Sequence, residues 1–107
     1  MLIEVSIATS VSVGDDALAN HQERIASFDR IITGVALCGG AAAADTKVEL
    51  FAGTARLGEV YNTTTGFPTA DHDRRVLFRV PRGIPLVAKI ADAPNTNAAY
   101  LRITGLP

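Results

Sequence analysis

Apolar residues recur at every second position in short runs along most of this chain. The runs are Ile3/Val5/Ile7, Ile31/Val35/Leu37, Val48/Leu50, Val76/Phe78/Val80, Leu86/Ala88/Ile90 and Leu101/Ile103. Side chains alternate between the two faces of a strand, so a period of two predicts strands with one buried face. Glycine, proline, aspartate, asparagine and threonine separate the runs, and these are the residues that turns favour. The pattern therefore predicts an all-β protein.

Seven or eight strands fit this pattern, within a single domain that spans residues 1–107. The expected strands are 2–13 (one long strand, or two broken near residues 9–10), 28–38, 46–52, 56–61, 75–80, 86–91 and 99–104. In the first of them, Ile3, Val5, Ile7, Val11 and Val13 share one face. The second is apolar or small on both faces, as expected of a central strand covered on both sides.

The connections indicate how the strands are arranged. Residues 53–54 predict a tight hairpin turn, and residues 81–85, with two prolines and a glycine, predict a rigid turn. Residues 17–26 are the one plausible helix, but their polar centre favours a loop with at most one helical turn. The long connections 14–27 and 62–74 are of the kind that cross between sheets. We expect an antiparallel β-sandwich, of Greek-key or jelly-roll topology.

Bulk composition removes several classes of function. With 48% hydrophobic and 20% charged residues, the chain is expected to fold as a globular domain. A net charge of −1 provides no positive field, so we expect no nucleic acid partner. No segment approaches the ~20 apolar residues that span a bilayer, so membrane insertion is not expected. The first residues lack a basic leader, and no signal peptide is predicted.

Few side chains suited to catalysis are present. The single cysteine, Cys38, ends an apolar strand, which predicts a buried and inert thiol. The two histidines, His21 and His72, lie in separate loops. We therefore predict a protein that is not an enzyme and that has no cofactor.

Two loops contain residues of the kind that bind cations. Asp71, His72 and Asp73 are weak candidates for a divalent metal site, although a solvated loop paired with the following arginines is the favoured interpretation. Calcium binding and simple turn chemistry both remain open for another set, with turn chemistry favoured; that set is Asp92, Asn95 and Asn97. The Asn62-Thr63-Thr64 triplet matches a glycosylation acceptor, which matters only in a eukaryotic secretory protein.

Charges are segregated along the chain. Every charged residue up to position 23 is acidic, and every charged residue from 74 to 89 is basic. Arginine is favoured in packed interfaces because its planar fork pairs with carboxylates through two hydrogen bonds. A solvated strand face is the favoured interpretation of these charges, and the alternative is a complementary contact, within the chain or between copies, that fixes orientation. The candidate interface residues are Arg74, Arg75, Arg79, Arg82, Glu4, Asp15 and Asp16.

The layout resembles that of the small single jelly-roll structural proteins of icosahedral virus and phage particles. The resemblance rests on the leading strand 2–13, the crossing 14–26, the buried strand 31–38 and the strand–turn–strand unit 75–91. It implies a non-enzymatic capsid, vertex or decoration subunit, which is made in the cytoplasm and incorporated into a virion. The implied partners are copies of itself or a larger shell protein. We favour a minor or decorating role because the chain is short.

Two other functions remain open from the sequence. The first is a carbohydrate-binding β-sandwich module, although the chain has no tryptophan and only Tyr61 and Tyr100 as tyrosines. The second is a small metal-binding protein that uses Asp71, His72 and Asp73.

Overall fold

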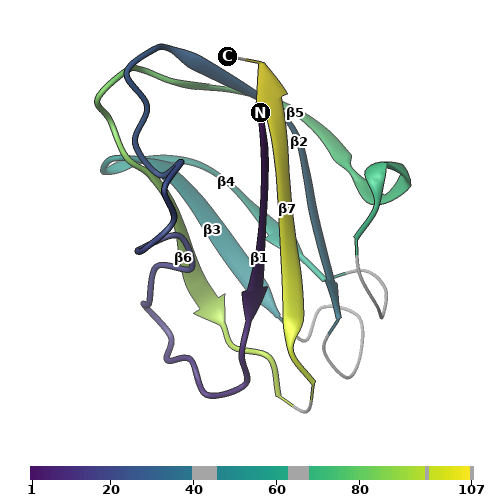
Figure 1. Cartoon of the computed structure of the whole chain (residues 1–107). Coiled ribbons are helices and arrows are strands. Elements are labelled where there is room, and N and C mark those ends of the chain that lie inside the picture. Colours follow the sequence, from purple (N-terminus) through teal and green to yellow (C-terminus); the bar gives the residue numbers. More distant parts are fainter. Residues whose placement is uncertain (40–45, 63–67, 96, 107) are drawn as a thin grey trace.

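The computed structural model describes residues 1–39, 46–62, 68–95 and 97–106, in which seven antiparallel strands form two sheets (Figure 1). The four-stranded sheet has the order β1 (Leu2–Ile7), β7 (Ala99–Leu106), β2 (Arg30–Gly39), β5 (Arg74–Val80). The three-stranded sheet has the order β4 (Ala55–Tyr61), β3 (Lys47–Ala52), β6 (Leu86–Asp92). The described residues contain no α-helix, and one 3₁₀ turn, η1 (Ala70–His72). The prediction of an all-β sandwich is confirmed.

Residues 14–17 run beside the free edge of β6 and extend the three-stranded sheet. The Gly14 amide donates to the Ile90 carbonyl at 2.8 Å, and the Ile90 amide donates to the Asp15 carbonyl at 2.8 Å. A third bond runs from the Ala17 amide to the Ala88 carbonyl at 2.8 Å. With this segment included, the pairings are nested: β1 pairs with β7, residues 14–17 with β6, β2 with β5, and β3 with β4.

The core lies between the two sheets and consists of aliphatic side chains from every strand. Residues at alternate positions point inward, as the period of two predicts. The buried aliphatic residues are Ile3, Ile7, Ile32, Val35, Leu37, Val48, Leu50, Val60, Val80, Leu86, Ala88, Ile90, Ala99, Leu101 and Ile103. Leu18 joins this cluster from the connection between β1 and β2.

The first strand is shorter than its alternation suggests. It ends at Ile7, and the chain turns at the predicted break near residues 9–10. Val13 is 67% exposed, so the prediction that it shares the buried face was wrong. The reason is that the chain leaves the first sheet after Ile7 and reaches β6 at Gly14, whose φ of 100° reorients the backbone.

The predicted loop over residues 17–26 is confirmed. It consists of turns, and its Arg24 carbonyl accepts a hydrogen bond of 2.8 Å from the Leu86 amide at the start of β6. The predicted hairpin turn at Gly53–Thr54 is also confirmed, because Ala52 pairs with Ala55 across it. The turn at Pro81–Pro85 connects β5 to β6, with Gly83 at a φ of 75°.

From Gly34 to its end, strand β2 is buried on both faces, as predicted for a central strand. Its outward-facing Ala36 and Cys38 are buried, in agreement with the prediction of a buried thiol. Residues 70–73, just before β5, lie over this outer face, where a Cβ atom added at Gly34 would lie 3.2 Å from the Asp73 Cβ. In the described part of the chain, no helix has the length and apolar character needed to cross a membrane.

Candidate functional site

The two edge strands of the four-stranded sheet carry opposite charges. Strand β1 forms one edge and β5 the other, so β7 and β2 lie between them (Figure 1). Glu4 is exposed on β1, whereas Arg74, Arg75 and Arg79 are exposed on β5. Alternation places Arg75 and Arg79 outward, as predicted, while Val80 is fully buried. Edge strands have unpaired backbone groups, which makes them sites where a further strand can add.

The arginines of β5 are little used within the chain. Arg79 Nη2 lies 3.3 Å from Asp29 Oδ2, but both side chains are largely exposed and such pairs contribute little. The backbone amide of Arg82 also donates to Asp29, at 2.9 Å, and chiefly for this reason the pKa of Asp29 is lowered. Arg74 and Arg75 form no ion pair with any residue that the structure describes. The basic edge is therefore available to a partner.

An exposed apolar side chain accompanies these arginines. Leu77 lies between Arg75 and Arg79 on β5 and is 79% exposed. On the neighbouring strands, Ile31 pairs with Leu106, and both are partly exposed. Leu77 is not among the interface residues that the charge pattern of the sequence predicts. The signal was present, because it shares the parity of the outward arginines rather than that of the inward valines.

The acidic candidates have three different roles. Glu4 is exposed and forms no ion pair with the described residues. Asp15 is exposed and accepts a hydrogen bond from the Ser12 amide at 2.9 Å. Asp16, by contrast, is mostly buried and forms an ion pair with Arg24 at 3.0 Å. Of the three acidic candidates, only Glu4 is therefore an exposed strand residue without an ion pair to a described residue. Asp15 and Asp16 stabilise turns.

Asp16 is a structural residue that fastens residues 14–17 to β6. Its Oδ1 atom accepts hydrogen bonds of 3.0 Å from the amides of Leu18 and Ala88. The first of these spans two residues, which is the pattern of an Asx turn. With both oxygens engaged inside the chain, Asp16 does not belong to the exposed acidic edge.

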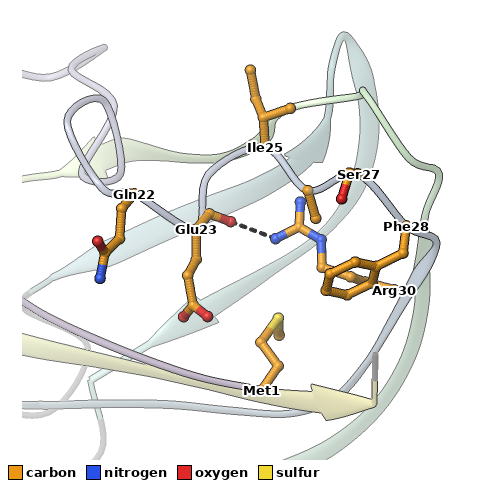
Figure 2. Close-up of a pocket in the computed structure, with 8 residues that line it drawn as sticks. Met1, Gln22, Glu23, Ile25, Ser27, Phe28 and Arg30 are labelled. Carbon is orange, nitrogen blue, oxygen red and sulfur yellow. Dashed lines mark hydrogen bonds between the residues drawn. The ribbon is translucent and has the colours of Figure 1, made fainter.

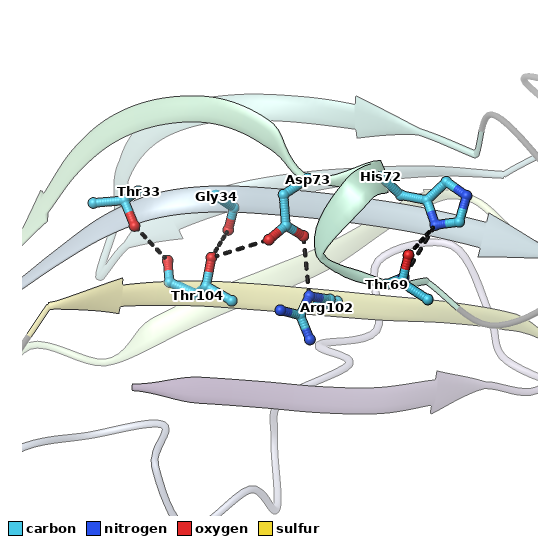
Figure 3. A network of polar contacts seen from close by, with 7 residues as sticks. All are labelled: Thr33, Gly34, Thr69, His72, Asp73, Arg102 and Thr104. Atoms are coloured by element: carbon cyan, nitrogen blue, oxygen red, sulfur yellow. Dashed lines mark hydrogen bonds and ion pairs between the residues drawn. The ribbon is translucent and has the colours of Figure 1, made fainter.

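Two of the three candidate metal ligands, His72 and Asp73, point in different directions (Figure 3). Asp73 Oδ1 accepts from Arg102 Nε at 3.1 Å, and its other oxygen faces Thr104 Oγ1 at 3.5 Å. His72 turns the other way, and its Nδ1 atom accepts from the Thr69 amide at 3.0 Å. Asp71 is exposed. Within the described ranges, no three or more His, Cys, Asp or Glu side chains are grouped so as to hold a metal ion.

The remaining polar candidates occupy ordinary structural positions. Asp92 is exposed at the end of β6, and Asn95 and Asn97 are exposed in the connection from β6 to β7. Asn62 is buried: its Oδ1 accepts from the Thr46 amide at 2.8 Å and its Nδ2 donates to the Gly39 carbonyl at 2.7 Å. The other two residues of the glycosylation triplet, Thr63 and Thr64, lie outside the described residues.

On the outer face of the three-stranded sheet, the charges neutralise one another. Glu49 and Glu59 face each other across β3 and β4, and Arg56 bridges them at 2.9 Å to each. Lys47 Nζ lies 2.8 Å from Glu59, which raises the pKa of Lys47 and lowers that of Glu59. This face thus differs from the β1 and β5 edges, whose charges have few partners.

The two tyrosines lie on different sheets. Tyr61 lies on β4, with the Lys47 ammonium group 5.4 Å from its ring centre, whereas Tyr100 lies on β7 in the other sheet. A sugar-binding surface made of neighbouring tyrosine rings is therefore not available to these two residues.

Comparison with known proteins assigns the chain to no family. No family model matches it, and no curated protein matches it in sequence.

Proposed function

We propose that this chain is a non-enzymatic structural subunit of jelly-roll topology that assembles with copies of itself or with a larger shell protein. The nested strand pairings support the topology. A jelly roll is a long antiparallel hairpin folded over into two sheets, so its first strand pairs with its last, and its second with the one before last. Here β1 pairs with β7, residues 14–17 with β6, β2 with β5, and β3 with β4.

The observation that carries the proposal is the pair of oppositely charged free edges on one sheet. Three antiparallel pairings separate β1 from β5, so these strands run in opposite directions. A second copy placed beside the first in the same orientation therefore brings its β1 alongside β5 as an antiparallel strand. The sheet continues from one copy to the next, and the buried and exposed faces stay aligned.

One register makes this contact complementary in both charge and hydrophobicity. If Glu4 of one copy lies opposite Arg75 of the next, antiparallel counting places Leu2 opposite Leu77. The charge pair selects the register, and the exposed leucine on β5 is covered. Pairing of β5 with another β5 about Leu77 would instead set Arg75 against Arg79, a repulsive arrangement. The interface therefore joins different edges, which produces rings or extended arrays.

In this proposal the subunit occupies a virion or a similar assembled particle as a minor capsid, vertex or decoration protein. Exposed edges that accept a neighbouring copy serve such a role directly.

Charge reversal tests the proposal. We expect Glu4→Arg and Arg75→Glu each to weaken self-association at least about tenfold in sedimentation velocity, because each places like charges opposite one another. The double variant exchanges the two charges and is expected to recover association. The control is Lys89→Glu, a charge reversal of the same size at an exposed position on β6. A wild-type chain that stays monomeric at high concentration, alone and with the products of neighbouring genes, would contradict the proposal.

A further inference from the structure

Arg30 is the most deeply buried charged side chain of the described residues, with 2% of its surface exposed. It is the first residue of β2 and shares the inward parity of Ile32. Its Nη1 atom donates to the Glu23 carbonyl, and its Nη2 atom donates to the Arg24 carbonyl at 3.0 Å. Arg30 therefore holds the connection between β1 and β2 against the end of the sandwich.

The guanidinium group of Arg30 is left without a carboxylate partner. It forms no ion pair with any described residue, and its buried Nε–H has no acceptor. Burial lowers the pKa of Arg30, and only the charge of Glu23 opposes this effect. Buried charges are normally paired, since each unsatisfied donor retains its desolvation cost. An unpaired buried cation is therefore a feature that a ligand can satisfy.

An open hollow of about 440 Å³ adjoins this guanidinium group (Figure 2). Its apolar lining includes the half-exposed side chains of Ile25 and Phe28, together with Met1. Ligand pockets of a few hundred Å³ commonly combine apolar walls with a few polar groups that fix orientation. Here the polar group is the Arg30 guanidinium, a cation whose planar N–H donors match the two oxygens of a carboxylate.

We propose that Arg30 and this hollow bind a carboxylate that carries a short apolar group. The carboxylate accepts from Nε, and the apolar group packs between Ile25 and Phe28. Because Nε is fully covered, a neighbouring side chain has to move aside on binding, and we assign this movement to the half-exposed ring of Phe28, which lines the same hollow. The carboxylate belongs either to a free short-chain acid or to the C-terminus of a peptide that ends in an aliphatic residue.

Glu23 acts as an internal competitor in this site. Its carboxylate lines the same hollow but turns toward Met1 and away from the guanidinium group (Figure 2). Only its backbone carbonyl is bonded to Arg30. The negative charge of Glu23 therefore repels an incoming carboxylate, and its removal should strengthen binding without loosening Arg30.

The test is a titration of the full chain, followed by ¹⁵N–¹H NMR, with 3-methylbutanoate and with its neutral amide. A second pair of probes, the peptide Ala-Ala-Leu with a free or an amidated C-terminus, distinguishes the two sources. We expect saturable shifts at residues 22–30 with at least one carboxylate, and affinity at least about tenfold lower for the matching amide. The better of the two carboxylates identifies the source.

Two Glu→Gln variants test whether the charge of Glu23 itself, rather than the net charge of the protein, affects carboxylate binding. Glu23→Gln is expected to tighten carboxylate binding several-fold, whereas the control Glu49→Gln, on the outer face of the other sheet, leaves it unchanged. Arg30→Lys keeps the charge, loses the fork and should weaken binding, with a dispersed NMR spectrum showing that it folds. The proposal is overturned if neither carboxylate saturates below about 20 mM, if the amides bind equally, or if Glu23→Gln behaves like Glu49→Gln. None of these outcomes depends on self-assembly.

Discussion

Asp73 and Arg102 form a largely buried ion pair of 3.1 Å that ties the loop before β5 to the outer face of β7. Their side chains are 17% and 16% exposed, so the pair is shielded from solvent. Thr104 extends the network, because its hydroxyl faces both Asp73 Oδ2 and the Gly34 carbonyl (Figure 3). Through these contacts the loop covers β2 and sets the position where the basic edge strand begins.

We expect Asp73→Asn to lower the free energy of unfolding by roughly 1.5–3 kcal/mol, the range for hydrogen bonds to charged groups. The neutral amide leaves the buried Arg102 charge without its partner. Urea denaturation of Asp73→Asn, Arg102→Met and the double variant measures the coupling between them. If the two single substitutions lower the free energy of unfolding by amounts that simply add in the double variant, the ion pair does not hold the loop.

Asn62 provides a second structural test. Its side chain links the Thr46 amide, just before β3, to the Gly39 carbonyl at the end of β2. Asn62→Ala leaves both backbone groups without this partner in a buried place, so we expect a loss of about 1–3 kcal/mol in unfolding free energy. Asn20→Ala, at an exposed turn position, should stay within about 0.5 kcal/mol of wild type. If Asn62→Ala and Asn20→Ala are equally stable, the Asn62 side chain does not stabilise the fold through these two hydrogen bonds.

Gly105 is required by a close approach between β7 and β2. A Cβ atom there would overlap the Ile31 carbonyl oxygen and lie 3.1 Å from the Ile32 Cα. Because these are backbone atoms, Gly105→Ala is expected to cost about 3 kcal/mol, the upper end for overpacking. A Cβ atom at Gly58 would contact only the tip of the Phe78 ring, at 3.0 Å, so Gly58→Ala should lower the stability by less. The loss of stability of each variant is measured by thermal unfolding. A smaller loss for Gly105→Ala than for Gly58→Ala would contradict the prediction.

The charge network on β3 and β4 predicts a dependence of stability on pH. The pKa of Glu59 is lowered, chiefly by the hydrogen bond from Lys47, so the folded state binds a proton less readily than the unfolded state. The resulting stabilisation is present above the ordinary pKa of 4.5 and is lost as the pH falls through the lowered folded value. Glu59→Gln should therefore be less stable than wild type at neutral pH, with a difference that shrinks in acid.

Urea denaturation across this pH range measures the effect. Asp71→Asn, which removes an exposed carboxylate without an ion pair among the described residues, is the control. A deficit of Glu59→Gln that does not change with pH would rule out the electrostatic explanation.

Alternation of apolar residues was sufficient to predict most strands and their buried faces. The residues that point into the core as predicted include Ile3, Ile7, Leu86, Ala88, Ile90, Leu101 and Ile103. They do so because a strand with one face against a core has a period of two whatever its partners are. The same parity rule predicted that Arg75 and Arg79 face outward. It failed at Val13, where the chain had already left the first sheet. It also failed at Ile31, which is exposed although Val35 and Leu37 are buried, because the strand register shifts between Ile32 and Gly34.

Tertiary pairing alone decided what each charged residue does. Asp16 and Asp73 appear in the sequence as exposed members of acidic or metal-binding groups, but Asp16 accepts a hydrogen bond from the Ala88 amide of β6 and Asp73 pairs with Arg102 of β7. Arg30 appears as an ordinary strand residue, yet it is buried without a carboxylate. The short-range pattern of the chain determines which face a side chain takes. The partner that it meets depends on strand order and register, which bring together residues far apart in sequence.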